Sequence, residues 1–366
     1  MNKISLAKIT TAIGLLAAVV SCSDPAPVFH ADGKPARLSE WHQLELVGSS
    51  WTPNKETEVF YPANQLFTDY AHKMRTLWIP QGTSAVLAGE DLVYPVGTVL
   101  TKTFYYPKDE TGSLLKVADN TALAIDTKTN QLIETRILVK RDAGWDALPY
   151  VWNDEQTDAF LRIAGASKSI SLKDAGRETI DFTYFVPNGN QCSGCHVTEH
   201  PDGGMHPLGA VAAQLHAKRH ESDSALQTEN LVAKGWLDEA PEIPATRAWR
   251  DETLPIEERA SAYLNMQCGH CHNPEGAADT SALILDGSHT LEVNRGICKP
   301  PIAAGGGAGN LQYAVVPGAP EKSILLYRMA SDKPDEMMPE LGRSLVHTEG
   351  LELLSKWIGE LAGDCG

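Results

Sequence analysis

The sequence predicts an α+β, multidomain chain, in which a β-rich domain over residues 38–187 precedes two mainly α-helical domains over 188–254 and 255–366. Strand-forming residues interrupted by Pro and Gly dominate the first part. After Pro187 the pattern changes to helical runs separated by long loops. A bound cofactor is expected to supply much of the core of each helical domain, because each contains one C-x-x-C-H unit: CSGCH at 192–196 and CGHCH at 268–272.

The β-rich domain is predicted from four stretches of alternating or aromatic sequence: DLVYPVGTVLTKTFYYP (91–107), TALAIDTKTNQLIETRILVKR (121–141), GWDALPYVW and DFTYFVP. The second stretch indicates a strand, a polar turn and a second strand. Residues 154–166, DEQTDAFLRIAGA, are the expected helix in this half. The aromatic residues are expected to fill a sandwich or barrel core, with a ligand-binding surface as the alternative.

Three later stretches predict amphipathic helices: PIEERASAYLNMQC (255–268), EKSILLYRMAS (321–331) and HTEGLELLSKWIGELAG (347–363). In the last stretch Thr348 is the expected N-cap, followed by an apolar stripe of Leu351, Leu354 and Trp357. The Gly-rich residues 303–310 indicate a loop without the Lys-Ser/Thr ending of a phosphate-binding loop, so nucleotide binding is not expected.

The N-terminus has the pattern of an export signal. Lys3 and Lys8 precede the uncharged run ITTAIGLLAAVV, which is shorter than the roughly 20 residues that span a bilayer. The ending VVSC resembles a bacterial lipoprotein signal, so residues 1–21 are the expected signal peptide, Cys22 the lipidated residue and 22–37 a tether. We therefore expect an exported, membrane-anchored lipoprotein that faces the periplasm or the outer surface.

Removal of residues 1–21 leaves 29 Lys and Arg against 47 Asp and Glu, a formal net charge of −18. Such an acidic chain is not expected to bind nucleic acid or anionic lipid surfaces. Of the seven cysteines, Cys22 and the four in the C-x-x-C-H units leave Cys298 and Cys365. In an oxidising compartment these two are expected to form a disulfide.

The two C-x-x-C-H units predict two covalently bound haem c groups. Two residues between the thiols place both sulfurs on one helical turn to reach the haem vinyl groups, and the next residue is the axial histidine. The expected thioether residues are Cys192, Cys195, Cys268 and Cys271, and the expected iron ligands are His196 and His272. His270 then occupies a spacer position. Structural zinc is the first alternative, but the two pairs lie 76 residues apart. A redox dithiol is the second, but neither unit lies beside a βαβ pattern.

The sixth iron ligand is predicted for only one haem. Pro339 favours an extended backbone at Met338, so Met337 and Met338 point to opposite sides. We choose Met338 as the ligand of the second haem and Met337 as a packing residue. For the first haem, bis-His, His/Met and five-coordinate states stay open, with these candidates: His200, Met205, His206, His216 and Met266.

From about residue 38 to the end, the sequence resembles a family of bacterial dihaem c-type cytochromes of unsettled biochemical role. The stretches that carry the resemblance include QLFTDYAHKMRTLWIPQG, FVPNGNQCSGCH, YLNMQCGHCHNPEGAA and MMPELGRSLVHTEGLELLSKWI. It implies haem attachment at both units, class I-like cytochrome c domains and a distal methionine in MMPELG. It also implies a parallel β-helix repeat protein as a partner. The segment PLGAVAAQLH departs from the family pattern.

Three functions are compatible with this sequence. The first is an electron carrier that relays single electrons between redox partner proteins while a lipid anchors it to the membrane. The second is a dihaem oxidoreductase, peroxidase-like or acting on a small molecule, with chemistry at the first haem. The third is a redox-linked binding module in which the β-rich domain recognises a carbohydrate or a protein.

Overall fold

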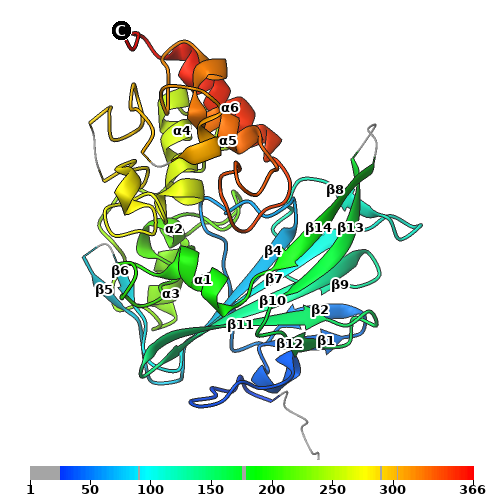
Figure 1. Ribbon diagram of the computed structural model, residues 1–366. Helices are drawn as coiled ribbons and strands as arrows, with labels where there is room; N and C mark the ends of the chain where they lie inside the picture. The colour runs from blue at the N-terminus through cyan, green and yellow to red at the C-terminus, as the bar shows by residue number, and fades with distance from the viewer. Residues whose placement is uncertain (1–24, 90, 175–178, 289–290, 303) are drawn as a thin grey trace, which may run out of the picture.

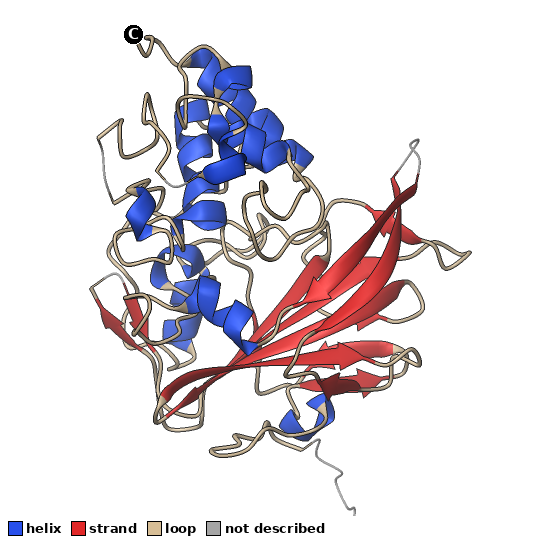
Figure 2. Cartoon of the chain, in the orientation of Figure 1, coloured by secondary structure: helices blue, strands red, loops and turns tan. Residues whose placement is uncertain are grey.

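The structure, a computed structural model, describes residues 25–366 apart from 90, 175–178, 289–290 and 303. An N-terminal β-rich region of residues 38–186 precedes a region with six modest helices, and Figure 2 shows the strands gathered on one side and the helices on the other. This confirms the α+β class. The predicted signal peptide and Cys22 lie outside the described residues. Within the described part of the chain, no helix has the length and apolar character needed to cross a bilayer.

The β-rich region is built on a six-stranded antiparallel sheet, here called the main sheet, with the strand order β12-β11-β10-β7-β4-β3. Its strands are β3 (Glu58–Val59), β4 (His72–Trp78), β7 (Val99–Pro107), β10 (Asn130–Arg141), β11 (Gly144–Trp152) and β12 (Ala159–Leu161). Because side chains alternate along each strand, the sheet has two faces that pack against different partners.

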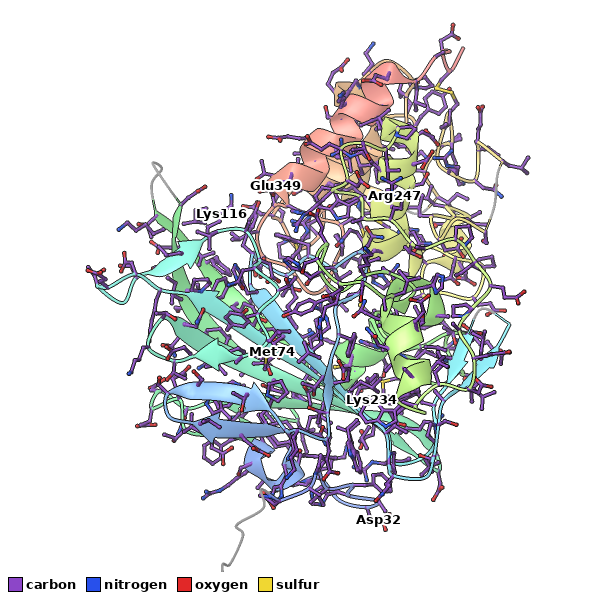
Figure 3. The ribbon with its side chains drawn as sticks, turned by 180° about the vertical axis from the view of Figure 1, so that it is seen from behind. Asp32, Met74, Lys116, Lys234, Arg247 and Glu349 are labelled. Carbon is purple, nitrogen blue, oxygen red and sulfur yellow. A yellow bond between two sulfur atoms is a disulfide. The ribbon has the colours of Figure 1, made fainter. Side chains whose placement is uncertain are left out.

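One face of the main sheet packs against a three-stranded sheet of β1 (Leu44–Val47), β2 (Ser50–Pro53) and β9 (Ile125–Asp126), and against the short helix η1 (Leu38–Trp41). Figure 3, which views the molecule from behind, labels Met74 in the middle of this packing. The largest fully buried side chains here are Trp41, Met74, Tyr105, Ile125, Tyr150 and Trp152. The aromatic residues of the strands thus form a sandwich core, as expected from the sequence.

The other face of the main sheet is covered at its two ends by different elements. At one end it meets a sheet of β8 (Leu114–Lys116), β13 (Ala166–Asp174) and β14 (Thr179–Val186), and at the other it meets the helical region around Leu215 and Leu231. A two-stranded ribbon, β5 (Val86–Ala88) and β6 (Asp91–Val93), lies beside the helices. The middle of this face is the part that later bounds the candidate site.

The helix predicted over residues 154–166 is wrong. These residues form a turn and the short strand β12. Gln156 has a left-handed φ of 58°, and its side chain accepts a hydrogen bond from the backbone N–H of Leu132 at 2.6 Å. The carboxylate of Asp158 accepts one from the backbone N–H of Ser39 at 3.1 Å. These contacts with residues distant in the chain outweigh the local helix propensity.

The six helices are α1 (Gly189–His196), α2 (Ala212–Leu215), α3 (Gln227–Ala233), α4 (Ile256–Leu264), α5 (Ile324–Ala330) and α6 (Thr348–Glu360). Helices α4, α5 and α6 occupy the predicted stretches and share one apolar cluster that includes Leu354 and Trp357. Thr348 is the first residue of α6 rather than its N-cap, which is His347. The Gly-rich loop contains the single 3-10 turn η4 (Gly305–Ala308).

Tyr70 joins the β-rich region to the helical region. Its hydroxyl lies 3.1 Å from Oε2 of Glu349 on α6, and the ammonium of Lys116 on β8 lies 4.1 Å from the centre of its ring. Figure 3 labels Lys116 and Glu349 where the sheets meet α6. The two regions are therefore in direct polar contact and not merely tethered.

Cys298 and Cys365 form a disulfide, as predicted. It attaches the C-terminal end of the chain, just after α6, to the loop that follows the second C-x-x-C-H unit.

We expect the double variant Cys298→Ser/Cys365→Ser to unfold with a free energy about 4 kcal/mol lower than that of the wild type, because a closed loop of this length restricts the unfolded chain. Chemical denaturation monitored by circular dichroism measures the difference. A thiol reductant should bring the wild type down to the stability of the double variant and leave the double variant unchanged. Equal stability of the oxidised wild type and the double variant would contradict the expectation.

Candidate cofactor site

A cavity of about 510 Å³ lies between the main sheet and the helical region, and both C-x-x-C-H units line it. Its walls are mainly apolar side chains with a few charged and imidazole groups. This volume and character are typical of small-molecule and cofactor sites. The main sheet, the two units and the 338–343 loop all contribute to its lining. The residues expected from the sequence that reach the cavity are Cys192, Cys195, His196, Cys268, Cys271, His272, Met266 and Met338.

The first unit is positioned by α1. Asn188 caps this helix by accepting a hydrogen bond from the backbone N–H of Gln191, whose side chain accepts one from Asn188 in return. The helix ends at His196, so Cys192, Cys195 and His196 lie within its last two turns. One short helix, whose N-terminus is held by two reciprocal hydrogen bonds, therefore carries two thiols and one imidazole at fixed spacing.

His196 is oriented by a backbone carbonyl. Its Nδ1 lies 2.6 Å from the carbonyl oxygen of His206, which can only accept, so Nδ1 is the protonated nitrogen. Among the described residues Nε2 has no hydrogen-bond partner. Burial lowers the pKa of His196 to about 4, which keeps the ring neutral at neutral pH. A neutral imidazole with a fixed Nδ1–H and a free Nε2 is the form that ligates metals.

The second unit follows α4 through η2 (Asn265–Gly269), a π-helical turn that shifts the chain direction before Cys271 and His272. Nδ1 of His272 lies 3.3 Å from the hydroxyl of Ser281, and burial lowers the pKa of His272 to about 4. The backbone of Leu283 is a further hydrogen-bonding partner of this ring. Both expected axial histidines thus have the same arrangement, with Nδ1 bound to the protein and the ring at the cavity.

The two units meet in space. The thiol of Cys271 donates to the carbonyl of Gly194 at 3.5 Å. Ligand atoms of Cys195, His270 and Cys271 all lie within 4.8 Å of one another. The neighbouring Cys271 thiol lowers the pKa of Cys195 to about 4, while the same interaction raises the pKa of Cys271. His270, expected to be a bystander, is therefore part of the contact between the units. The separation of the pairs in the sequence no longer argues against a shared metal.

Met338 lies on a loop that is held in place by hydrogen bonds to the side chains of Arg343 and Asp69. The buried guanidinium of Arg343 donates to the carbonyls of Met338, Ser331, Arg328 and Leu345, at 2.8, 2.9, 3.2 and 3.3 Å. The carboxylate of Asp69 accepts hydrogen bonds from the backbone N–H groups of Ser344 and Leu345, both at 2.7 Å. Met338 lines the cavity, whereas Met337 is 8% exposed and is absent from its walls.

Of the five candidates for the first distal ligand, only Met266 lines the cavity, and it is buried. The carbonyl of His206 binds Nδ1 of His196, which puts its backbone behind that ring, and its side chain is exposed. Met205 packs beside the core cluster of the sheet and the helices. His216 is buried and bonded to Thr228 at 2.9 Å, and His200 is exposed.

Several cavity residues were not singled out from the sequence: Arg75, Lys102, Arg136, Lys299, Arg328, Arg343 and His347. The strand pattern in the sequence could have identified the first three residues. They occupy inward positions of strands in which apolar residues would be expected, as in ETRILVKR. Arg343 and His347 sit in irregular segments, where no periodicity marks a buried side.

These residues fit a covalently attached haem. The donor set at each unit is two thiols and one imidazole held at Nδ1, and three methionines, Met266, Met329 and Met338, line the cavity. No protein-family model, curated protein or solved structure matches the chain. The geometry and the donor chemistry therefore carry the functional argument.

His347 is a buried aromatic contact of the cavity wall. Its ring stacks on Phe67 at 4.3 Å between centres, and its Nδ1 is hydrogen-bonded to the hydroxyl of Tyr263 at 2.8 Å. Burial, together with the positive charges of Arg250 and Lys73, lowers the pKa of His347 to about 3. The folded protein therefore holds this imidazole neutral.

Because the folded pKa of His347 is below the unfolded value, only the unfolded chain takes up this proton as the pH falls below about 6.5. Protonation of His347 in the unfolded chain therefore lowers the free energy of unfolding progressively from pH 6.5 towards pH 3. We expect the wild type to lose about 2 kcal/mol more than His347→Gln between pH 7 and pH 5. Denaturant unfolding at both pH values measures this. His220→Gln, at an exposed position, should behave as wild type; an identical loss in His347→Gln and wild type would refute the assignment.

Proposed function

We propose that the protein is an exported dihaem c-type cytochrome that transfers electrons at the membrane surface or in the periplasm. The observation that carries the proposal is that two C-x-x-C-H units line one mainly apolar cavity, with the histidine Nδ1 atoms bound to the protein. The resemblance noted in the sequence, which extends beyond these two units, implies the same function. In this proposal the helical region comprises two class I-like haem domains, over 188–254 and 255–366.

A c-type haem supplies reversible one-electron chemistry at its iron. The chain's own residues have distinct roles. Cys192 and Cys195, and likewise Cys268 and Cys271, form the thioether bonds. His196 and His272 would hold the iron atoms through Nε2, and Met338 would supply a sulfur ligand at the second unit.

The contact between the units favours electron transfer over two separate redox functions. Cys195 and Cys271 are neighbours, so cofactors attached to them share one enclosed space. The acidic balance of the chain favours redox partner proteins with basic docking patches, with association rates that fall as salt rises. The parallel β-helix repeat protein implied by the resemblance is one such proposed partner, and the lipid on Cys22 is the proposed anchor.

A dihaem oxidoreductase is the second candidate. Charged groups of the main sheet line the cavity beside the first unit, which would suit a polar small molecule at that haem. A redox-linked binding module is supported less, because the middle of the sheet faces the cavity instead of an outside partner. Cyanide and carbon monoxide binding to the reduced protein separates the first two functions: resistance at both irons excludes chemistry at an open haem.

Zinc is the alternative that the contact between the units favours. Cys195, His270 and Cys271 could supply three ligands of an open tetrahedral site. Zinc binding there leaves the other two cysteines and both oriented histidines without a role, so we prefer haem. A haem protein and a zinc protein differ in colour and in metal content.

The mature wild type, produced with haem maturation, should contain two covalent haems. Cys192→Ala/Cys195→Ala and Cys268→Ala/Cys271→Ala should each contain one, because each pair attaches one haem. Intact mass and the pyridine haemochrome spectrum count the haems. Cys298→Ser/Cys365→Ser, which changes the disulfide alone, should retain both. A colourless wild type containing zinc would refute the proposal.

Replacing Arg343 with methionine should release the loop that carries Met338. We expect the methionine–iron charge-transfer absorption to disappear, the potential of the second haem to fall and the free energy of unfolding to drop by about 2–4 kcal/mol, because several carbonyls lose their donor. Lys333→Met is the matched control, since its side chain is 65% exposed in the same segment. An unchanged absorption in Arg343→Met would exclude this role for the loop.

A further inference from the structure

A row of three cationic side chains crosses the floor of the cavity. Arg75 on β4 pairs with Lys102 on β7, and Lys102 pairs with Arg136 on β10. Residues in cross-strand register point to the same face of a sheet, and all three line the cavity. We call this set the cationic row.

Apolar positions lie on one side of the cationic row, and a mixed set lies on the other. On one side the same three strands place Leu77, Leu100 and Leu138 in register. On the other side Phe104 pairs with Lys73 and Glu134. The row therefore lies between an apolar set and a set with charged members, and nothing in sheet formation requires three cations there.

The acidic groups near the row neutralise only part of its charge. Glu134, fully buried, binds Arg136 through two hydrogen bonds at 2.6 and 2.9 Å and also accepts one from Tyr184. Arg75 donates to the neutral amide oxygen of Gln65 at 3.0 Å, with Asp119 as a more distant counter-charge.

Lys102 is the member of the row that is not neutralised. Its ammonium has no hydrogen-bond acceptor among the described residues, and it lies 4.9 Å from the centre of the Phe104 ring, whose other cationic contact is Arg136 at 4.5 Å. Burial lowers the pKa of Lys102, and the charges of Arg75, Arg136 and Lys73 lower it further, with Glu134 opposing them. Like charges gathered in a poorly hydrated cavity are unfavourable unless an anion joins them.

The row lies beside the first C-x-x-C-H unit. Helix α1, which carries Cys192, Cys195 and His196, packs on β11 next to the strands of the row, and these three residues line the same cavity as Lys102 and Arg136. A group bound to the row therefore lies within the first cofactor site, enclosed by the same walls.

We propose that Arg75, Lys102 and Arg136 form a binding site for a carboxylate or similar oxyanion at the first C-x-x-C-H unit. Guanidinium groups bind such anions through two parallel hydrogen bonds, and an ammonium adds a point charge. The proposal rests on the proposed function. It also gives the β-rich region a role, because that region supplies the anion-binding floor of the cofactor site.

Two sources have this chemistry. The first is the pair of propionate groups carried by a haem at the first unit. The second is a free small anion, which the oxidoreductase function would require. Both are recognised by the same three side chains, so the experiment has one arm for each.

Lys102→Met is the informative variant, because it removes the cation that lacks an acidic partner among the described residues and leaves the Arg136–Glu134 pair intact. Lys218→Met removes the same charge at an exposed position and is the matched control. The full-length mature holoprotein is used throughout. Haem content is measured first, followed by the potential of each haem across the neutral pH range. The visible spectrum is then recorded during titration with acetate or inorganic phosphate at constant ionic strength.

If haem propionates occupy the row, the pH-dependent step in one haem potential should move up by about one pH unit or more in Lys102→Met, because an adjacent cation lowers a carboxyl pKa. Added anions should then change neither protein. If a free anion occupies it, acetate or phosphate should perturb the wild type saturably, and Lys102→Met should bind it about ten- to a hundredfold more weakly. The proposal is overturned if Lys102→Met matches Lys218→Met in both measurements.

Should Lys102→Met fail to retain two haems, Arg75→Gln removes another member of the row, and Lys102→Arg tests rescue by a conservative change; the same two readouts then decide. Failure of the proposed function is recognised separately. A colourless wild type refutes haem binding. Anion binding to that protein is then measured as the rise in its unfolding temperature in phosphate. Loss of this rise in Lys102→Met supports the anion site, and an unchanged rise contradicts it.

Discussion

The structure depends on how one face of the main sheet is covered, at one end by a smaller sheet and at the other by the helical region. The two ends of that face are closed by apolar clusters, one with β13 and β14 and the other with α2 and α3. The middle, with Arg75, Lys102 and Arg136, is not closed by packing and bounds a cavity instead. Both C-x-x-C-H units line this one cavity, so two short motifs that lie far apart in the chain contribute to the same site.

Each motif is held by ordinary local interactions. A capping box positions α1, a π-helical turn positions the second unit, and a carbonyl or hydroxyl fixes each histidine ring. These interactions orient the two imidazoles at the cavity wall. The loop of Met338 needs more support, since it has no regular structure, and Arg343 and Asp69 supply it from opposite ends. The β-rich region therefore belongs to the site, because Asp69 and the cationic row both come from it.

Local features of this fold were predictable from the sequence, and long-range contacts were not. The strands over 91–107 and 121–141 follow from period-two patterns and the helices over 255–268, 321–331 and 347–363 from amphipathic spacing, because packing agrees with local preference there. The pairing of Cys298 with Cys365 was the exception, because these were the two cysteines left unassigned in a chain expected to enter an oxidising compartment. The helix over 154–166 was wrong because Gln156 and Asp158 bind residues far away in the chain. The meeting of Cys195 with Cys271 and the register of the cationic row depend on tertiary structure, which no periodicity encodes.

The central claim is that two haems share one cavity, and electron paramagnetic resonance of the fully oxidised mature protein tests it most directly. We predict two ferric haem signals whose line shapes show magnetic interaction. When Cys192→Ala/Cys195→Ala removes one haem, the remaining signal should lose that broadening. Two independent haem spectra in the wild type, unchanged by loss of the neighbour, would contradict a shared cavity. Absence of any ferric haem signal would contradict the account as a whole.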